Sequence, residues 1–184
     1  MLTVPAEVWR GGVVRRAVTI GVPIGLFFGA LAWLDSGFFL AGAMVFVIVG
    51  AGYGIWMARR MARYWPGASE LTDAQRVTVV TTARRGIPVG AAALAPAVIA
   101  YSQGLHAAAE KGRPWRWLVV VVLIGVAMMA LWDAVMGSWG NVLASLIYLV
   151  LVGLEMSWWP VRRTELLGNA NRAAATARHM AVGD

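Results

Sequence analysis

The sequence contains no cysteine, only nine acidic residues and only two histidines among its 184 residues. The lack of cysteine excludes a disulfide framework, a thiolate nucleophile and a zinc site built on sulfur. His106 and His179 have no metal-ligand neighbour at helical spacing. Ser36, Ser138 and Ser145 have no histidine base at the same depth, and phosphate loops, dinucleotide fingerprints and paired carboxylates are absent from the sequence. The sequence therefore predicts no catalytic residue, no cofactor, no metal and no enzyme activity.

Charge is also scarce, whereas apolar residues are abundant. Charged residues make up 14% of the chain and hydrophobic residues 60%, against roughly 25% and roughly 45–50% in ordinary globular chains. The chain has 10 tryptophans and 21 glycines. Tryptophan collects at membrane interfaces, and glycine is commoner in transmembrane helices than in soluble ones. The composition predicts a protein whose surroundings are the lipid bilayer.

Four apolar stretches approach the length of about 20 residues that a helix needs to cross a bilayer. They cover residues 17–34, 38–57, 115–132 and 142–159. The first follows a basic stretch, as a signal peptide does, but its apolar run is longer than that of a signal peptide, so we expect it to be retained. The last two are short, and tryptophans at their ends are expected to anchor them at the interfaces. These tryptophans are Trp115, Trp117, Trp132, Trp158 and Trp159.

The basic residues predict the orientation, because they accumulate in the cytoplasmic segments of membrane proteins. With the N-terminus inside, a four-span topology places all 16 Lys and Arg residues in cytoplasmic segments. The two outer turns then carry Asp35 and Asp133 instead. A fifth crossing at residues 87–101 would move the basic residues after it to the other side, so we do not count it as a span. The formal net charge of +7 is thereby explained, and we expect no nucleic-acid partner.

The predicted fold is an all-α membrane protein with four transmembrane helices and both termini in the cytoplasm. Residues 1–64 form an N-terminal arm and the first two spans, and residues 65–114 form a cytoplasmic helical hairpin. Residues 115–160 form the last two spans, and residues 161–184 form a cytoplasmic tail. We expect the tail to continue the fourth helix and then fray. The predicted location is the bacterial cytoplasmic (inner) membrane.

The cytoplasmic hairpin has local signals for two helices. Thr72 and Gln75 form a capping-box pattern, in which each side chain satisfies a free backbone amide at a helix start. Gly86 is suited to the left-handed position that ends the same helix. A second helix is expected over residues 89–111, disturbed near Pro96.

Regularly spaced glycines predict a helix-packing interface in the first two spans. Small residues four apart line one face of a helix and let another backbone approach closely. Two interpretations are open: the two spans pack on each other, or one glycine face meets another protein. The glycines concerned are Gly21, Gly25, Gly29, Gly42, Gly50 and Gly54.

Glu155 is the main ionisable residue predicted inside the membrane, and such residues are functional candidates because their burial is costly. One interpretation is that Glu155 extends to the interface and pairs with Arg162 or Arg163. The other is a proton or cation site, for which Thr19 and Tyr53 are the polar candidates in the other spans.

Several short motifs in the second half of the chain are similar to those of a protein group. They are LTDAQR at residues 71–76, ARRG at 83–86, LAPAV at 94–98 with Tyr101, and NANR at 169–172. Together, over residues 71–172, they resemble a loosely defined group of small actinobacterial, mycobacterial-type membrane proteins of unknown function. The resemblance implies a bacterial inner membrane and no catalytic residues. Some proteins of this kind are accessory subunits of envelope assemblies, such as lipid-import transporters of the mammalian-cell-entry type.

These features favour a non-catalytic accessory or scaffolding subunit of a larger inner-membrane complex, with other integral membrane proteins as partners. One alternative is a small self-associating transporter or channel. Small multidrug exporters are of similar length, but they carry their membrane-embedded glutamate in the first helix, whereas Glu155 lies in the last. A lipid-modifying enzyme or a regulator that acts through the hairpin is a third alternative, for which the sequence offers no nucleophile or base.

Overall fold

The computed structural model describes residues 4–111, 121, 124–125, 127–128, 131–132, 135 and 139–182. This part of the chain is helical and contains no strand, which confirms the predicted all-α class. Its α-helices are α1 (Val13–Ser36), α2 (Phe39–Tyr64), α3 (Asp73–Arg85), α4 (Ala95–Lys111) and α6 (Trp139–Val182). Its short 3₁₀ helices are η1 (Ala6–Trp9), η2 (Pro66–Glu70) and η3 (Ala92–Leu94).

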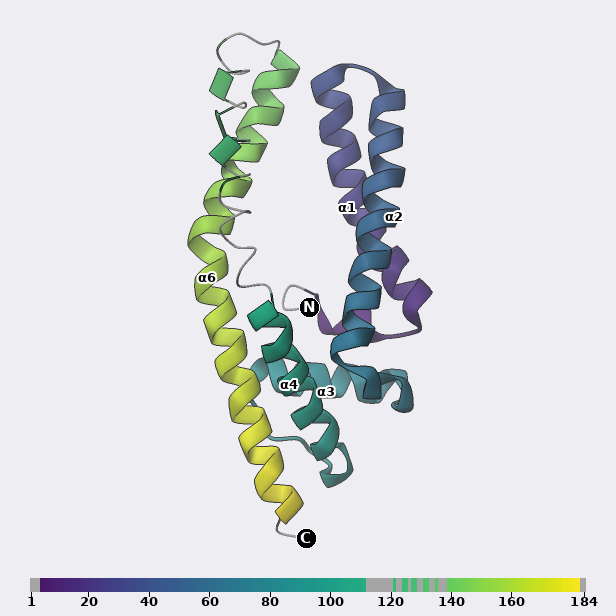
Figure 1. The fold of residues 1–184 in the computed structure, drawn as a ribbon, viewed down its shortest axis with the longest axis vertical. Coiled ribbons are helices and arrows are strands. Elements are labelled where there is room, and N and C mark those ends of the chain that lie inside the picture. The colour runs from purple at the N-terminus through teal and green to yellow at the C-terminus, as the bar shows by residue number, and fades with distance from the viewer. Residues whose placement is uncertain are drawn as a thin grey trace.

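The helices form an elongated molecule whose packed core lies in its lower half (Figure 1). Helices α1 and α2 stand side by side as an antiparallel hairpin, whose turn lies at the top. Helix α6 runs along the opposite side of the molecule over almost its full height. Helices α3 and α4 lie between the lower part of α6 and the lower end of the hairpin. The lower half therefore joins all the long helices.

Helices α1 and α2 are each long and apolar enough to cross a membrane. In their most apolar stretches of 18 residues, only 22% of α1 and 17% of α2 is buried. A core helix of a soluble protein would be mostly covered, whereas these two expose valine, leucine, isoleucine and aromatic side chains along their length. The predicted spans at residues 17–34 and 38–57 correspond to α1 and α2, and each helix is longer than the predicted span.

The other two predicted spans are described less completely. The third, residues 115–132, falls largely outside the described residues. The fourth, residues 142–159, lies within α6, which continues without a break through Pro160 to Val182. The predicted continuation of the fourth helix into the tail is present, but the expected fraying is wrong. The lower part of α6 buries Ala170, Ala173 and Ala177 completely, and this packing holds the helix to its end.

The first helix predicted for residues 65–114 forms as its sequence indicates. The Thr72 hydroxyl accepts from the Gln75 amide at 3.3 Å, and the Gln75 side chain accepts from the Thr72 amide at 2.9 Å. Gly86 ends α3 with φ of +69°. The second helix, expected from residue 89, begins only at Ala95. The expectation that Pro96 would disturb this helix is wrong, because Pro96 lies in its first turn, where a missing amide hydrogen costs nothing.

The core of the molecule lies in the lower half. Helices α3 and α4, the lower end of α2, the lower part of α6 and the N-terminal arm all contribute to it. By contrast, the upper part of the α1–α2 hairpin buries mainly its glycines. The largest fully buried side chains are Trp9, Trp65, Tyr101, Met61, Leu105, Val79, Val80 and Val98.

Candidate functional site

The six predicted interface glycines lie between α1 and α2, where all of them are buried. A Cβ atom on Gly25 would lie 2.6 Å from the Phe46 carbonyl oxygen, and one on Gly29 would lie 2.7 Å from the Gly42 carbonyl oxygen. Real Cβ atoms essentially never approach another atom within 3.0 Å. The backbones of the two helices therefore touch along this line, which we call the glycine seam.

The lower end of the glycine seam is at least as tight as its upper end. A Cβ atom on Gly21 would overlap the Gly50 carbonyl oxygen, and one on Gly54 would overlap the carbonyl oxygen of Ala17. Phe46 fills the space between Gly25 and Gly29 from the opposite helix. Of the two interpretations of the glycines, the structure places the two spans against each other, so that the glycine faces are covered within the chain.

Of the candidate polar residues in the predicted spans, Thr19 and Tyr53 are described, and they form no hydrogen bond with each other. Glu155 lies within α6, but its side chain is outside the described part of the chain. Asp133 is outside the described residues. The Thr19 hydroxyl donates to the Arg15 carbonyl oxygen of its own helix at 2.8 Å. Tyr53 is half-buried, and its ring packs against Trp56. A proton or cation pathway through Glu155 stays a prediction.

The tryptophans predicted to anchor the last two spans are mostly outside the described side chains. Trp115 and Trp117 lie in the undescribed segment, and the side chains of Trp158 and Trp159 are not described either. Trp132 is described, and 69% of its surface is exposed.

Sequence reasoning missed that arginines fasten the N-terminal arm to the lower half. The Arg76 guanidinium donates to the Gly11 carbonyl oxygen at 3.0 Å, and Arg84 donates to the carbonyl oxygen of Val4. Arg16 is almost fully buried at 4% exposure, and it donates to the Trp9 carbonyl oxygen at 3.3 Å. Main-chain oxygens give no sequence signal, so these contacts could not be predicted.

The arm places Trp9 in an aromatic cluster at the centre of the core. The Trp9 ring centroid lies 5.0 Å from that of Trp65 and 5.9 Å from that of Tyr101, with the rings edge to face. This geometry suits the ring quadrupoles. The Arg16 guanidinium lies over the Trp9 ring, 4.7 Å from its centroid. Burial raises the pKa of Tyr101 from 10.0 to about 12, because the buried site disfavours the charged phenolate.

The last turn of α4 is held from both sides by arginines. Arg60 of α2 donates to the Ala108 carbonyl oxygen at 3.1 Å, and Arg163 of α6 donates to that of Ala109 at 2.7 Å. Carbonyl oxygens at a helix C-terminus lack partners in the helix and carry its negative dipole end, so guanidinium groups suit them. These contacts position helices and do not line a cavity.

Helix α6 is also fixed to α3 and α4 through amide and hydroxyl groups. The Asn169 side-chain amide donates to the Arg84 carbonyl oxygen at 2.7 Å, and the Ser102 hydroxyl donates to that of Ala170 at 3.1 Å. Gly86, at the end of α3, lies directly against Asn169. The polar side chains of the lower half therefore serve mainly to join α3, α4 and α6.

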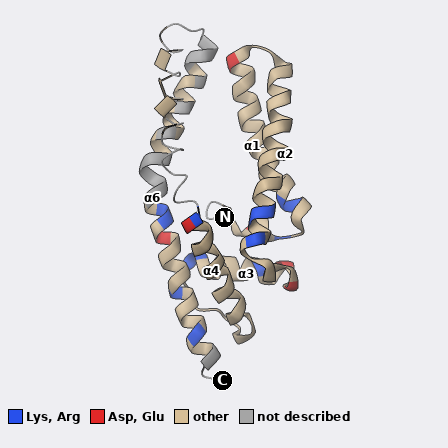
Figure 2. Ribbon diagram, viewed as in Figure 1, with Lys and Arg blue, Asp and Glu red and all other residues tan. Residues whose placement is uncertain are grey.

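Charge is distributed unequally between the two ends of the molecule. Among the described residues, the Lys and Arg positions lie in the lower half of the ribbon (Figure 2). The acidic position at the top is the α1–α2 turn, where Asp35 lies. Between these ends the hairpin carries apolar residues only, apart from Ser36, Thr19 and Tyr53.

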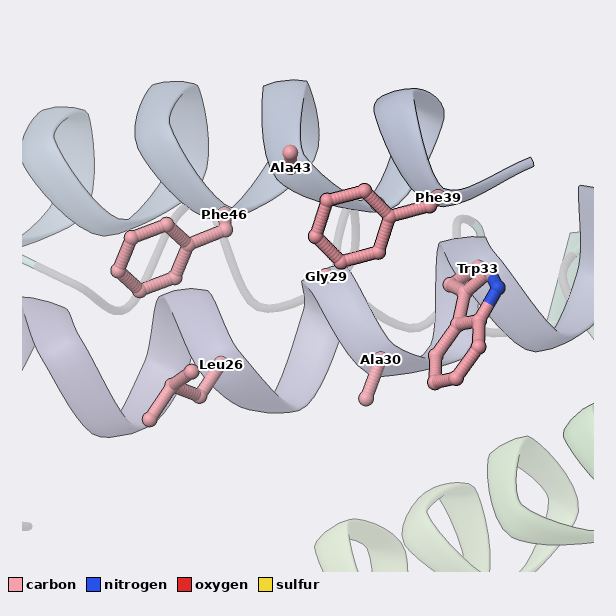
Figure 3. Close-up of a pocket in the computed structure, with 8 residues that line it drawn as sticks. Leu26, Gly29, Ala30, Trp33, Phe39, Ala43 and Phe46 are labelled. Carbon is pink, nitrogen blue, oxygen red and sulfur yellow. The ribbon is translucent and has the colours of Figure 1, made fainter.

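An open apolar hollow of about 280 Å³ lies on the hairpin near its turn (Figure 3). The Trp33 and Phe39 rings meet edge to face at one end of it, with centroids 6.3 Å apart. Its lining offers a ligand apolar contact and one indole nitrogen, which suits hydrocarbon and gives little specificity. The lining residues are Leu26, Gly29, Ala30, Trp33, Phe39, Gly42, Ala43 and Phe46.

Comparison of the chain with protein-family models, with curated proteins and with solved structures found no match.

Proposed function

We propose that this protein is a multi-pass subunit of the bacterial inner membrane that organises a larger complex and performs no catalysis itself. It crosses the bilayer four times, with both termini and residues 65–114 in the cytoplasm. Its partners are other integral membrane proteins, and an assembly that moves lipid across the envelope is the candidate complex.

The observation that carries this proposal is the division of the molecule into an apolar half, which has no Lys or Arg among its described residues, and a packed basic half. Its apolar side chains face outward on α1, α2 and the upper part of α6, for example Leu26, Met44, Ile48, Leu146 and Val150. Lipid tails or partner helices would cover such a surface. The basic half would then lie on the cytoplasmic side, as positive residues do in bacterial membrane proteins.

A structural role is favoured over chemistry by the use that the chain makes of its polar groups. Arg16, Arg60, Arg76, Arg84 and Arg163 all donate to main-chain carbonyl oxygens. They tie the N-terminal arm, α2 and α6 to one cytoplasmic body. A packed body joined to exposed apolar helices is suited to fixing the relative positions of partner subunits.

The test is the size and composition of the protein as it leaves gently solubilised native membranes. The tagged full-length chain is purified in a mild detergent, and native mass spectrometry then measures which proteins accompany it and in what ratio. We expect a fixed stoichiometry with larger membrane proteins that survives repeated washing. A control tagged four-span protein of the same membrane, purified in parallel, identifies contaminants.

A homogeneous monomer or homo-oligomer in that experiment would contradict the subunit proposal. The alternative of a small self-associating transporter would then be preferred. Its first test would be a Glu155→Gln variant in a transport assay with proteoliposomes.

A further inference from the structure

The outer face of α2 ends in two arginines that the described part of the chain does not use. Arg59 and Arg63 lie one helical turn apart, and both are exposed. Neither has a hydrogen-bond or ion-pair partner among the described residues. Arg60, between them in sequence, points elsewhere: it donates to the Ala108 carbonyl oxygen and lies over the Trp56 and Tyr64 rings.

The same face of α2 continues upward as an apolar strip. Ile55 is 45% exposed and Ile48 is 66% exposed. Between them, Gly52 leaves a notch, because a Cβ atom at this position would meet nothing within 4 Å. The residues follow one another at intervals of three or four, so they share one face of the helix. That face lies opposite the glycine seam, and α1 does not cover it.

An apolar strip that ends in two guanidinium groups, neither with a partner in the described part of the chain, matches the two parts of a phospholipid. The acyl chain of a lipid beside a membrane helix lies roughly parallel to the helix, and its phosphate lies at the level of the interface. Guanidinium groups bind phosphate oxygens through paired hydrogen bonds. A basic residue near the surface gains about 1 kcal/mol from an anionic leaflet, which corresponds to about a fivefold preference.

We propose that this face of α2 is a binding site for an anionic phospholipid of the cytoplasmic leaflet. The phosphate lies between Arg59 and Arg63, and one acyl chain runs along Ile55, over the notch at Gly52, to Ile48. The inference rests on the membrane placement in the proposed function, and it adds a lipid class and a location on the protein.

The test uses the full chain in nanodiscs made from equal parts of phosphatidylcholine and phosphatidylglycerol. Native mass spectrometry of the released protein measures the ratio of the two lipids that stay bound. We expect phosphatidylglycerol to be enriched on the wild-type chain. The R59Q/R63Q double variant should lose on the order of tenfold of this preference.

The matched control is the R85Q/R178Q double variant, which removes the same charge from exposed arginines of α3 and α6. It should keep the wild-type preference. A Gly52→Leu variant fills the notch without a change of charge, and it should weaken retention of the lipid. An equal loss in both double variants, an unchanged R59Q/R63Q variant, or undiminished retention by Gly52→Leu would each overturn the proposed site.

Failure of this inference is distinguishable from failure of the proposed function. A chain that alkaline carbonate strips from native membranes would contradict the membrane placement itself. A chain that resists carbonate but shows no lipid preference in nanodiscs would contradict the lipid site alone.

Discussion

The guanidinium groups of Arg60 and Arg163 approach the last turn of α4 from opposite sides and donate to the carbonyl oxygens of adjacent residues, at 3.1 and 2.7 Å. Arg60 belongs to α2 and Arg163 to α6, so the C-terminus of α4 is one of the points at which α2 and α6 are connected. Since an arginine on each side holds the same turn, we expect both to contribute to the stability of the whole lower half.

An Arg163→Gln variant should lower the free energy of unfolding by about 1.5–3 kcal/mol, the usual contribution of a hydrogen bond with a charged partner. The neighbouring Arg162→Gln variant is the control. Arg162 forms an exposed ion pair with Glu165, and such pairs contribute about 0–1 kcal/mol. Thermal unfolding of both variants in the same detergent measures the difference. Equal midpoints would contradict the role assigned to Arg163.

The glycine seam predicts a sharp difference between two glycines of α2. A Cβ atom at Gly54 would overlap the Ala17 carbonyl oxygen, whereas one at Gly52 would meet nothing within 4 Å. Gly54→Ala should therefore force the helices apart and cost about 1–3 kcal/mol, as overpacking does. Gly52→Ala should be neutral or slightly stabilising. Unfolding in detergent compares the two, and a Gly54→Ala protein as stable as Gly52→Ala would show that the seam is not closed.

The buried phenol of Tyr101 predicts a pH dependence of stability. Its pKa is raised by burial from 10.0 to about 12, so the folded state holds this proton more tightly than the unfolded state does. The unfolded chain therefore gains stability by releasing the proton as soon as the pH passes 10. The free energy of unfolding should fall as the pH rises from 10 towards 12.

The contribution of Tyr101 is measured by comparing unfolding of the wild type and Tyr101→Phe across this pH range. The variant should lack the part of the slope that belongs to this phenol. Identical slopes in the two proteins would mean that Tyr101 titrates normally and that the aromatic cluster with Trp9 and Trp65 opens in solution.

The parts of the fold that depend on local chemistry were predictable from the sequence. The capping box of Thr72 and Gln75 and the left-handed Gly86 are encoded within a few residues of the elements they delimit, and α3 begins and ends as predicted. The glycines of the first two spans were predicted to pack closely, because their spacing alone fixes which helix face they share. The spacing does not identify the surface against which this helix face packs.

Contacts between distant residues were not predictable in this way. Arg84 and Val4 are 80 residues apart, and Arg163 and Ala109 are 54 apart. Each contact uses a backbone oxygen, which every residue has. The alanine-rich sequence favours a helix from residue 89, whereas α4 begins at Ala95 and has Pro96 in its first turn. The order of the tail depends on its burial against α3 and α4. Such packing between distant segments cannot be read from the local sequence, which by itself predicts fraying.

The measurement that tests the account most directly is the side of the membrane on which each end of the molecule lies. The chain contains no cysteine, so single cysteines can be introduced at Asp35, Ser69, Ser138 and Ala175 without a background to remove. Intact cells are treated with a membrane-impermeant maleimide, and permeabilised cells serve as the control. We predict that Asp35→Cys and Ser138→Cys are labelled in intact cells, whereas Ser69→Cys and Ala175→Cys are labelled only after permeabilisation. Labelling of Ser69→Cys or Ala175→Cys in intact cells would contradict the four-span topology with a cytoplasmic basic half.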